Sequence, residues 1–384
     1  MIELIPDGYT DCAAAINRAI ELLSPRGGEI VLPPGDILLR EPINIKTGQV
    51  SLLGSGREIT RLIIDNTKGC AIAIEGHNTQ VSRVSVRNLS INSRCSLDVG
   101  AGIKIAYGYD VRIKNCLIAN LNFGVECLDS SFIYITDCEI VDPRSLGGGG
   151  ILVHGNGIHN DHYFSRVFVQ CRKQVVACEV GIRISNSQGF WLDQCGIFHC
   201  NVGLHLLASN GQTLEHGFLS NNAIDTCVQH GILINASDSG VVRRVQSTSD
   251  WVASNEGHGV LLDAGTGSID DIKLLGARLY GNGGNGLLMV DVGMISVDNS
   301  NVAGNGRNGI SSGITVQGSC DSLMVRNCTI GAFSGYSNTQ AYGIAGIEYS
   351  ARALITGNAF EGNRKGALSS RPLQAVIENN LNDI

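Results

Sequence analysis

Apolar and polar residues alternate with a period of two along most of the chain, in short stretches separated by turns rich in Gly, Asn and Ser. Alternation of this kind predicts short β-strands with one buried face. From residue 102 onward, a pattern of Gly, apolar, any residue and apolar returns every 22 to 31 residues. Its copies are GIKI (102–105), GVEC (124–127), GILV (150–153), GIRI (181–184), GLHL (203–206), GILI (231–234), GVLL (259–262), GLLM (286–289) and GITV (313–316).

A second strand-like stretch follows copies of this pattern, as in VRIKNCLI (111–118) and FWLDQCGI (190–197). Repeats of this length, with no helices between the strands, are typical of a right-handed parallel β-helix, whose coils carry three short strands each. Proline is absent between Pro143 and Pro372, as expected where backbone N–H groups bond to the next coil. We therefore expect an all-β solenoid that forms a single domain over residues 1–384.

The beginning of the chain follows a different pattern. Thr10 can cap a helix that runs to about Leu23 with one apolar face, and Pro25 ends it. A solenoid exposes apolar groups at its open end, and an amphipathic helix can cover them. The prediction is an N-terminal capping α-helix within residues 1–28, followed by coils over residues 29–384.

Composition and charge narrow the range of partners. The net charge is −7 and no basic tract occurs, which argues against nucleic acid. No apolar run is long enough to cross a bilayer, so no membrane partner is expected. The first residues, MIELIPDGYT, lack the basic start and apolar core of a secretory signal.

Cysteine usage bears on the compartment and on metals. The chain has 13 cysteines, an odd number, and many recur at one repeat position, which favours buried free thiols over disulfides. This indicates synthesis in a reducing cytoplasm and leaves open whether the protein acts there, in a virion or outside the cell. No CxxC pair or other strong metal-ligand spacing occurs, so neither a metal nor a cofactor is predicted.

One turn position of the repeat carries amide and carboxyl side chains, for which we expect an internal hydrogen-bonded ladder. Its members are Asn115, Asp137, Gln170, Gln194 and Asn327. A cysteine follows each of them, and these cysteines are expected to form a buried column.

Residues 7–56 contain the segments DGYTD, GGEIVLPPG and LLGSG, in that order. They resemble the start of the pectate-lyase-like superfamily, in which DG-x-TD leads into a capping helix, a glycine turn, V-x-[LI]-PPG and L-x-G-x-G. The matching residues are Asp7, Gly8, Thr10, Asp11, Gly27, Gly28, Pro33, Pro34, Gly35, Gly54 and Gly56. This version of the motif is frequent in phage tailspike polysaccharide depolymerases. The resemblance implies a β-helix that acts on a glycan, often as a homotrimer, and it transfers no catalytic residue because the matched region is the structural cap.

Chemistry is expected on one column of side chains, because the third residue of the glycine pattern points outward in every coil. The column comprises Lys104, Glu126, Leu152, Arg183, His205, Leu233, Leu261, Leu288 and Thr315. Its first half is charged and its second half is apolar. We expect its ionisable side chains to line one face over the length of several sugar rings.

The longest repeat contains HGNGIHNDHYF (154–164), which holds three of the nine histidines. This stretch leaves the strand directly beside Leu152. We therefore expect it to overhang the charged column and to wall a cleft. The residues that would do so are His154, His159, Asp161, His162 and Tyr163.

Two reactions fit such a cleft. Elimination in a uronate-containing glycan needs a cation for the developing enolate and a base for the C5 proton. Arg183 suits the first role, and His205, His162 or Tyr163 the second. Hydrolysis needs two carboxyl groups, and the candidate pairs are Glu126 with Asp161 or Asp193, and Asp250 with Glu256. Aromatic rings at Tyr163, Trp191 and Trp251 can stack on sugar faces.

The sequence therefore predicts a polysaccharide depolymerase for a bacterial or other acidic glycan, with β-elimination slightly favoured over hydrolysis. The predicted catalytic residues are Arg183, His205, His162, Glu126 and Asp161. The predicted substrate-binding residues are Lys104, His154, His159, Tyr163, Trp191 and Trp251. A non-catalytic glycan-binding spike and an epimerase or transferase on the same scaffold are the alternatives.

Overall fold

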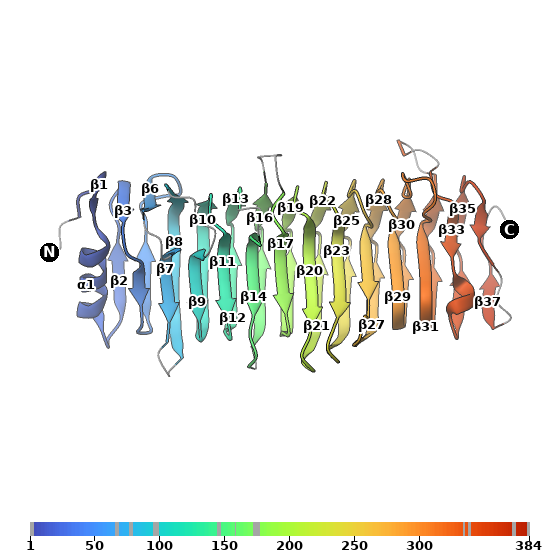
Figure 1. The fold of residues 1–384 in the computed structure, drawn as a ribbon, viewed down its shortest axis with the longest axis horizontal. Coiled ribbons are helices and arrows are strands. Elements are labelled where there is room, and N and C mark those ends of the chain that lie inside the picture. Colours follow the sequence, from blue (N-terminus) through green and yellow to red (C-terminus); the bar gives the residue numbers. More distant parts are fainter. Residues whose placement is uncertain are drawn as a thin grey trace. The chain divides into compact units, whose positions relative to one another are not determined.

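The computed structural model of the protein describes residues 4–65, 69–76, 80–94, 100–143, 147–157, 159–171, 177–332, 335–336, 339–370 and 374–381. The chain folds as a right-handed parallel β-solenoid with an N-terminal helix, as the repeats predict (Figure 1). Its residues group into two compact units, Met1–Ile182 and Arg183–Ile384, and each unit is described by itself. The single domain over residues 1–384 stays a prediction.

The first unit begins with one strand and one helix and continues with further strands. They are β1 (Asp7–Asp11), α1 (Ala13–Leu23), β2 (Gly28–Val31), β3 (Gly35–Leu39), β4 (Ile43–Ile45), β5 (Val50–Leu53), β6 (Thr60–Ile64), β7 (Cys70–Glu75), β8 (Val81–Ser93), β9 (Ala101–Ala106), β10 (Gly108–Ala119), β11 (Phe123–Leu128), β12 (Ser131–Thr136), β13 (Glu139–Val141), β14 (Gly149–His154), β15 (Asn160–Ser165) and β16 (Phe168–Gln170). Strand β17 (Val180–Ser185) contains the boundary between the units.

The second unit continues with strands and one turn of 3₁₀ helix. Its elements are β18 (Gln188–Asp193), β19 (Gly196–Phe198), β20 (Val202–Ala208), β21 (Thr213–Ser220), β22 (Ala223–Asp225), β23 (His230–Ala236), β24 (Val241–Thr248), β25 (Trp251–Ala253), β26 (Val260–Asp263), β27 (Ser268–Leu275), β28 (Arg278–Tyr280), β29 (Leu287–Asp298), β30 (Asn301–Ala303), β31 (Ile314–Arg326), β32 (Thr329–Gly331), β33 (Tyr342–Ala345), η1 (Ile347–Tyr349), β34 (Ala353–Thr356), β35 (Ala359–Glu361), β36 (Gly366–Leu368) and β37 (Ala375–Glu378).

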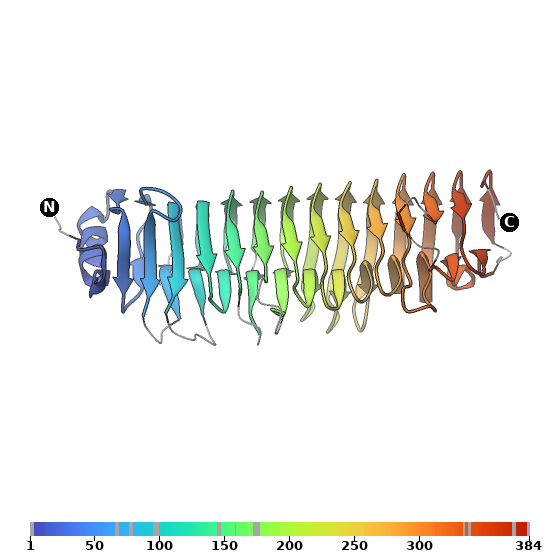
Figure 2. The same cartoon turned by 90° about the horizontal axis from the view of Figure 1, so that it is seen from above.

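Equivalent strands of successive coils pair in parallel and build three faces, which we name A, B and C (Figure 2). Face A holds β7 and the glycine-pattern strands β9, β11 and β14 in the first unit, and the glycine-pattern strands β20, β23 and β26 in the second. Face B holds β12 and β15 in the first unit and β18, β21, β24 and β27 in the second. Face C holds β13 and β16 in the first unit and β22, β25 and β28 in the second.

Alternation along each strand decides which side chains form the core. In β11, Val125 and Cys127 are completely buried, whereas Glu126 between them is partly exposed. Val125 pairs with Ile103 of the preceding coil and with Ile151 of the following one. Aliphatic side chains therefore stack in register inside the coils, and the residues between them are presented to solvent.

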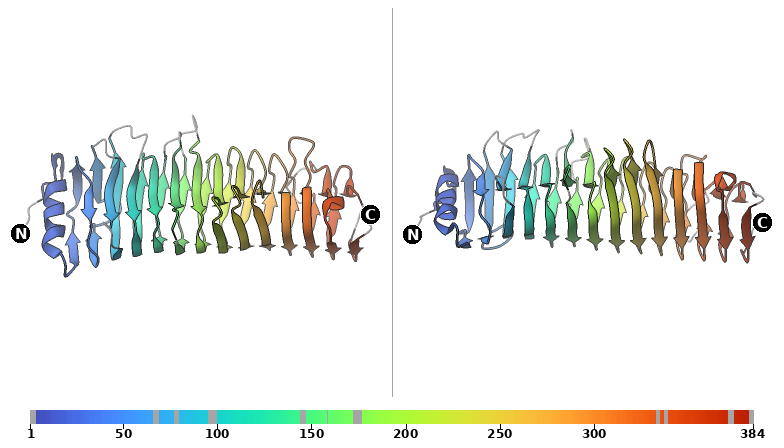
Figure 3. Two further views of the ribbon diagram at one scale, coloured as in Figure 1. Left: turned by 60° about the horizontal axis from the view of Figure 1, so that its bottom comes forward. Right: turned by 90° about the horizontal axis from the view of Figure 1, so that it is seen from below.

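Helix α1 packs against β2 and β4 at the beginning of the first unit, as the predicted lid should (Figure 3). Ala13, Ile16 and Ile20 form its buried face. The expected cap at Thr10 is wrong, because the Thr10 side chain binds Asp7 and the helix starts only at Ala13. No helix among the described residues is long and apolar enough to span a membrane.

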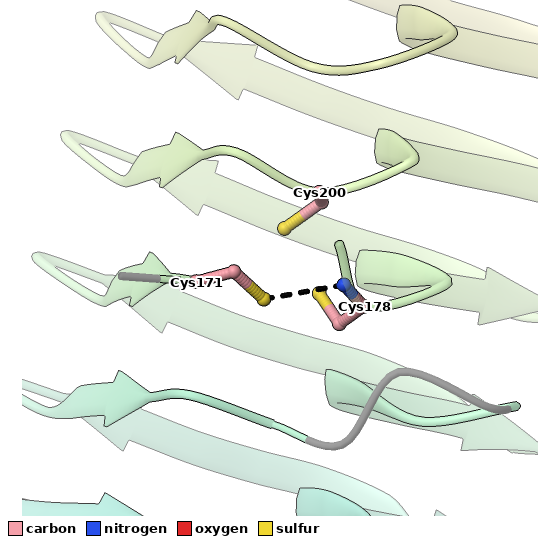
Figure 4. A group of neighbouring side chains, drawn as sticks. All are labelled: Cys171, Cys178 and Cys200. Carbon is pink, nitrogen blue, oxygen red and sulfur yellow. Dashed lines mark hydrogen bonds between the residues drawn. The ribbon is translucent and has the colours of Figure 1, made fainter. Parts of the chain in front are cut away.

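Buried free thiols are confirmed for the twelve cysteines that the structure describes; Cys95 lies outside the described residues. In the first unit, the backbone N–H of Cys178 donates a hydrogen bond to Sγ of Cys171 at 3.3 Å (Figure 4). Cys200, which Figure 4 also labels, belongs to the second unit and is itself buried. Such thiols act as small apolar side chains in the core.

The predicted amide ladder is wrong for most of its members, although Asn115 donates to Oδ1 of Asn88 in the preceding coil at 3.0 Å. Asp137 binds Arg166 instead, while Gln194 and Asn327 are exposed. An internal ladder does exist in the second unit. It lies at the turn that follows each short face C strand, whereas Asp137, Gln194 and Asn327 precede such a strand. There the side-chain amides of consecutive coils donate to one another: Asn255 to Asn282 at 2.9 Å, Asn282 to Asn305 at 2.8 Å, and Asn305 to Gln340 at 3.0 Å.

Candidate functional site

The predicted charged column exists on face A of the first unit. Lys104, Glu126 and Leu152 are direct partners in the β9–β11–β14 register. Lys104 lies 2.8 Å from the carboxylate of Glu75, and this hydrogen bond raises the pKa of the lysine. Nε2 of His154 lies 3.0 Å from Oε1 of Glu126, and this hydrogen bond lowers the pKa of the glutamate. Face A of the first unit therefore carries two adjacent pairs of ionisable groups.

Beyond His154, the histidine-rich stretch does not overhang this column, and the expected cleft wall is wrong for its other members. His154 ends β14 on face A, and the turn after it is held by Gly157 N–H, which donates to Oδ1 of Asp129 at 2.8 Å. The chain then enters β15 on face B, where Tyr163 pairs with Tyr134 of β12. Asp161 and Tyr163 therefore belong to a different face from Glu126. The Glu126–Asp161 pair for hydrolysis is not assembled.

His159 and His162 lie inside the solenoid, with exposed fractions of 1% and 0%. His162 occupies the inward position two residues before Phe164, which pairs with Ile135. Burial lowers the pKa of His159 to about 4 and that of His162 to about 3. Both rings are therefore neutral at ordinary pH and out of reach of a polysaccharide, which contradicts their predicted roles.

The second unit brings together the two residues that were predicted to carry elimination. Nε–H of Arg183 donates a hydrogen bond to Nδ1 of His205 at 3.1 Å. Nε2 of the same ring lies 2.6 Å from Oδ1 of Asn235. Because Nδ1 accepts and a carbonyl oxygen can only accept, the ring proton resides on Nε2.

Asn235 completes this group and was missed in the sequence. It pairs with Leu207, two residues after His205 on the same strand, so it stands in the neighbouring outward column of face A. The signal that could have found it is this spacing of two along adjacent strands. Beyond His205, the column continues with Leu233, Leu261 and Leu288 in direct register. An apolar strip therefore adjoins the Arg183–His205–Asn235 group.

The predicted sugar-stacking aromatics are distributed over several places. In the first unit, Tyr163 stacks on Tyr134 with ring centroids 4.9 Å apart. In the second unit, Trp191 on face B stacks on Phe218 at 5.6 Å, whereas Trp251 on face C meets Tyr280 edge-on at 5.5 Å. Trp191 and Trp251 therefore cannot belong to one stacking platform.

The remaining carboxylates predicted for hydrolysis have structural partners. Asp193 accepts a hydrogen bond from Ser220 at 2.7 Å. Asp250 is completely buried, accepts bonds from Asn222 and Ser247, and has a pKa raised to about 6, with burial as the main cause. The Asp250–Glu256 pair is therefore not available at the surface.

A shallow pocket of about 180 Å³ on face B of the second unit was also missed. It is lined by His216, Phe218, Arg244, Gln246, Asp271 and Lys273. These residues form no motif in the sequence, because Phe218, Gln246 and Lys273 come from three successive coils and are far apart in the chain. Within either unit taken by itself, the described residues include no group of three His, Cys, Asp or Glu side chains close enough to hold a metal ion.

Comparison with known proteins identifies the family. The family described as rhamnogalacturonase A/epimerase, pectate lyase-like, matches residues 3–233. The chain belongs to this pectate-lyase-like family. The family described as periplasmic copper-binding protein (NosD) also matches, over residues 156–383. No curated protein sequence matches the chain.

Solved structures of the same fold come from several kinds of protein. The A-module of mannuronan C-5 epimerase AlgE6 from Azotobacter vinelandii is 14% identical, with 99% of this chain and 97% of that one covered and a TM-score of 0.63. Tailspike protein 3 of bacteriophage CBA120 is 16% identical, with 100% and 61% covered and a TM-score of 0.67. DFA-IIIase from Arthrobacter chlorophenolicus A6 in complex with GF2 is 13% identical, with 97% and 96% covered and a TM-score of 0.56. Identities this low establish the shared fold.

Proposed function

We propose that the protein is a carbohydrate-active enzyme that cleaves an acidic polysaccharide by β-elimination on face A of its second unit. The observation that carries the proposal is the hydrogen-bonded chain from Arg183 through His205 to Asn235. Membership of the pectate-lyase-like family supports the substrate class. The fold shared with a mannuronan epimerase and with phage tailspikes is consistent with it.

The guanidinium of Arg183 would bind the carboxylate of a uronate unit. In doing so it would exchange its hydrogen bond to His205 for a charge-assisted bond to the substrate, which is the stronger interaction. Nδ1 of His205 would then present its lone pair to the C5 proton. Substrate binding and activation of the base are in this way coupled through one hydrogen bond.

Proton removal leaves negative charge on the uronate carboxylate, where Arg183 stabilises it. Asn235 keeps the other ring nitrogen occupied and fixes the orientation of the imidazole while Nδ1 accepts the proton. The bond between C4 and the glycosidic oxygen then breaks, and the departing oxygen takes a proton from the newly formed imidazolium. The products are a new reducing end and a sugar with a C4–C5 double bond.

The first unit, taken by itself, carries further candidate substrate contacts. Lys104, Glu126 and His154 are outward-facing on its face A and hold hydrogen-bonding groups that suit sugar hydroxyls. We propose them as substrate contacts, without a chemical role.

Trp251, which is 37% exposed on face C of the second unit, is proposed as a separate stacking position. A homotrimer is proposed from the family resemblance and is tested by the molar mass in solution.

Incubation with a panel of acidic bacterial polysaccharides tests the proposed reaction. Elimination predicts that ultraviolet absorbance and reducing ends rise together. Reducing ends alone would identify a hydrolase, and an altered sugar at constant chain length would identify an epimerase. Binding without any product would favour a glycan-binding spike. Each of the last three outcomes would overturn the proposed elimination.

A further inference from the structure

Face B of the second unit carries two parallel columns of outward side chains. The first column is Trp191, Phe218, Gln246 and Lys273, which pair directly from coil to coil. At about 4.8 Å per coil, it spans about 14 Å. Its aromatic end consists of the stacked Trp191 and Phe218 rings, inclined by only 16°, and Phe218 is 42% exposed.

The second column arises from a left-handed residue that recurs at one place in three successive coils. His216, Arg244 and Asp271 fall between paired positions of β21, β24 and β27, and their φ angles of 57°, 56° and 51° are left-handed. Left-handed backbone is unfavourable for residues other than glycine. These three ionisable residues line the pocket together with Phe218, Gln246 and Lys273 of the first column.

Each cation of the pocket contacts one carboxylate, which is either shared with another cation or held at a long distance. Nη1 of Arg244 lies 2.9 Å from Oε2 of Glu215, but this oxygen also accepts a bond from Nε of Arg243 at 2.7 Å. Nζ of Lys273 lies 3.3 Å from Oδ1 of Asp271, longer than the roughly 2.7–2.9 Å of a strong charge-assisted bond. Arg244 and Lys273 are therefore suited to bind an added anion.

We propose that this pocket is a binding site for an anionic sugar unit, whose ring stacks on Phe218 while its acidic group binds Arg244 and Lys273. Aromatic side chains take the apolar face of a sugar ring, and two cations beside the ring discriminate acidic from neutral sugars. The pocket is on face B and the Arg183–His205–Asn235 group is on face A, so this is a second site of the second unit. It rests on the proposed function only in taking the ligand to be an acidic glycan.

Fluorescence of Trp191 provides a direct measurement of binding, because this ring contacts Phe218. A Trp251→Phe background leaves Trp191 as the only tryptophan, and adding His205→Ala prevents turnover of the ligand. The probes are hexasaccharides of galacturonate and of mannuronate, with neutral maltohexaose for comparison. We expect saturable changes in fluorescence with at least one acidic probe and none with maltohexaose.

Variants then assign the binding to the pocket. Arg244→Gln combined with Lys273→Gln should weaken acidic binding about tenfold or more, as loss of bonds to a charged group does, and Phe218→Ala should weaken it as well. The matched controls Arg352→Gln and Tyr349→Ala change exposed residues of the same unit away from the pocket and should bind as the background does.

Three results would overturn the proposal: no saturable change with either acidic probe, equal binding of maltohexaose, or full binding by the pocket variants. These results are separable from those that test elimination. If the pocket variants bind normally and His205→Ala abolishes cleavage in an otherwise unmodified chain, the pocket assignment fails and elimination stands. If the pocket binds acidic probes and no polysaccharide is cleaved, the pocket assignment stands and elimination fails.

Discussion

Nδ1 of His159 lies 3.5 Å from Nε2 of His162 inside the first unit, where both imidazole rings are almost completely buried. Two protonated rings cannot be tolerated at this distance in a core that offers little solvation. Accordingly, burial lowers both pKa values, and the neighbouring ring lowers that of His162 further. The pair therefore works as neutral core packing, with His162 stacked near Phe164.

The buried pair makes folding sensitive to acid. In the unfolded chain a histidine has a pKa of about 6.5, whereas the folded values are about 4 and about 3. Between these limits the unfolded state binds more protons, so the pair costs no stability above about pH 6.5 and progressively lowers it as the pH falls towards 4. The His162→Phe variant should lack the part of this loss of stability that His162 causes, on the order of 2 kcal/mol at pH 5.

Urea unfolding at pH 7 and pH 5 measures this effect. The difference in unfolding free energy between the two pH values should be smaller in His162→Phe than in the unmodified protein. His258, whose pKa is lowered to about 4, and Asp250, whose pKa is raised to about 6, also titrate, but they are unchanged in the variant. Equal pH dependence in the two proteins would show that His162 is protonated in the folded state.

The proposed base and its positioning residue should differ in how their loss affects catalysis. His205→Ala removes the proton acceptor and should lower kcat by about 10² to 10⁴. Asn235→Ala leaves the ring in place without its Nε2 partner, so we expect a smaller loss of kcat with little change in KM. Initial rates of ultraviolet absorbance on the cleaved polysaccharide measure both.

The control for these variants is Gln317→Ala, since Gln317 stands in the same outward column of face A as Asn235 and is exposed far along it. The Gln317→Ala variant should retain the kcat of the unmodified protein. Full activity of His205→Ala would remove the imidazole from the mechanism. A loss of kcat in Gln317→Ala as large as in Asn235→Ala would show that Asn235 has no special role.

The internal amide ladder should contribute strongly to the stability of the second unit. Asn282 donates to Asn305 and to the backbone oxygen of Val252, and its own oxygen accepts from Asn255. Asn282→Ala leaves these buried partners unsatisfied, at about 1–3 kcal/mol for each group. Chemical denaturation should show a large decrease in unfolding free energy, whereas exposed Gln317→Ala should change it little. A loss below about 1 kcal/mol would mean that the ladder is replaceable by water.

On face A of the first unit, the hydrogen bond from His154 keeps the pKa of Glu126 below its ordinary value. His154→Ala should therefore raise this pKa, which NMR titration of the glutamate carboxyl carbon can follow. The stability that the bond provides is present above the ordinary glutamate pKa and is lost as the pH falls through the lowered value. Because both groups are partly exposed, we expect less than about 1 kcal/mol. An unchanged Glu126 titration would contradict the bond.

The sequence was sufficient to predict the fold because inward positions must be apolar in every coil. Ile151 and Val153 are buried, as the glycine pattern requires. The same rule failed for His162, since a polar residue at an inward position looks like an outward one until the strand register is known. Once β15 is placed on face B, burial of His162 follows from its position two residues before Phe164.

The candidate site was predictable only along one column. Arg183 and His205 share the same place in successive glycine patterns, so their contact follows from the repeat. Asn235 lies one column away, so its contact with His205 follows only after the two strands are placed in register. The face B pocket includes His216, Arg244 and Asp271 in left-handed backbone conformation, which residue types such as His and Arg do not predict. The sequence repeat therefore predicts which residues are neighbours within one column, but not which residues are neighbours in two adjacent columns.

Because Asn255, Asn282 and Asn305 repeat one hydrogen bond at one place in each coil, the ladder can lose one of these residues together with its coil. Excision of residues 256–282 would join Asn255 to the start of the next coil and leave it facing Asn305 in place of Asn282. The second unit can therefore be lengthened or shortened by whole coils, with every remaining ladder amide still facing the amide of a neighbouring coil. Lengthening or shortening by part of a turn would break the stack at once.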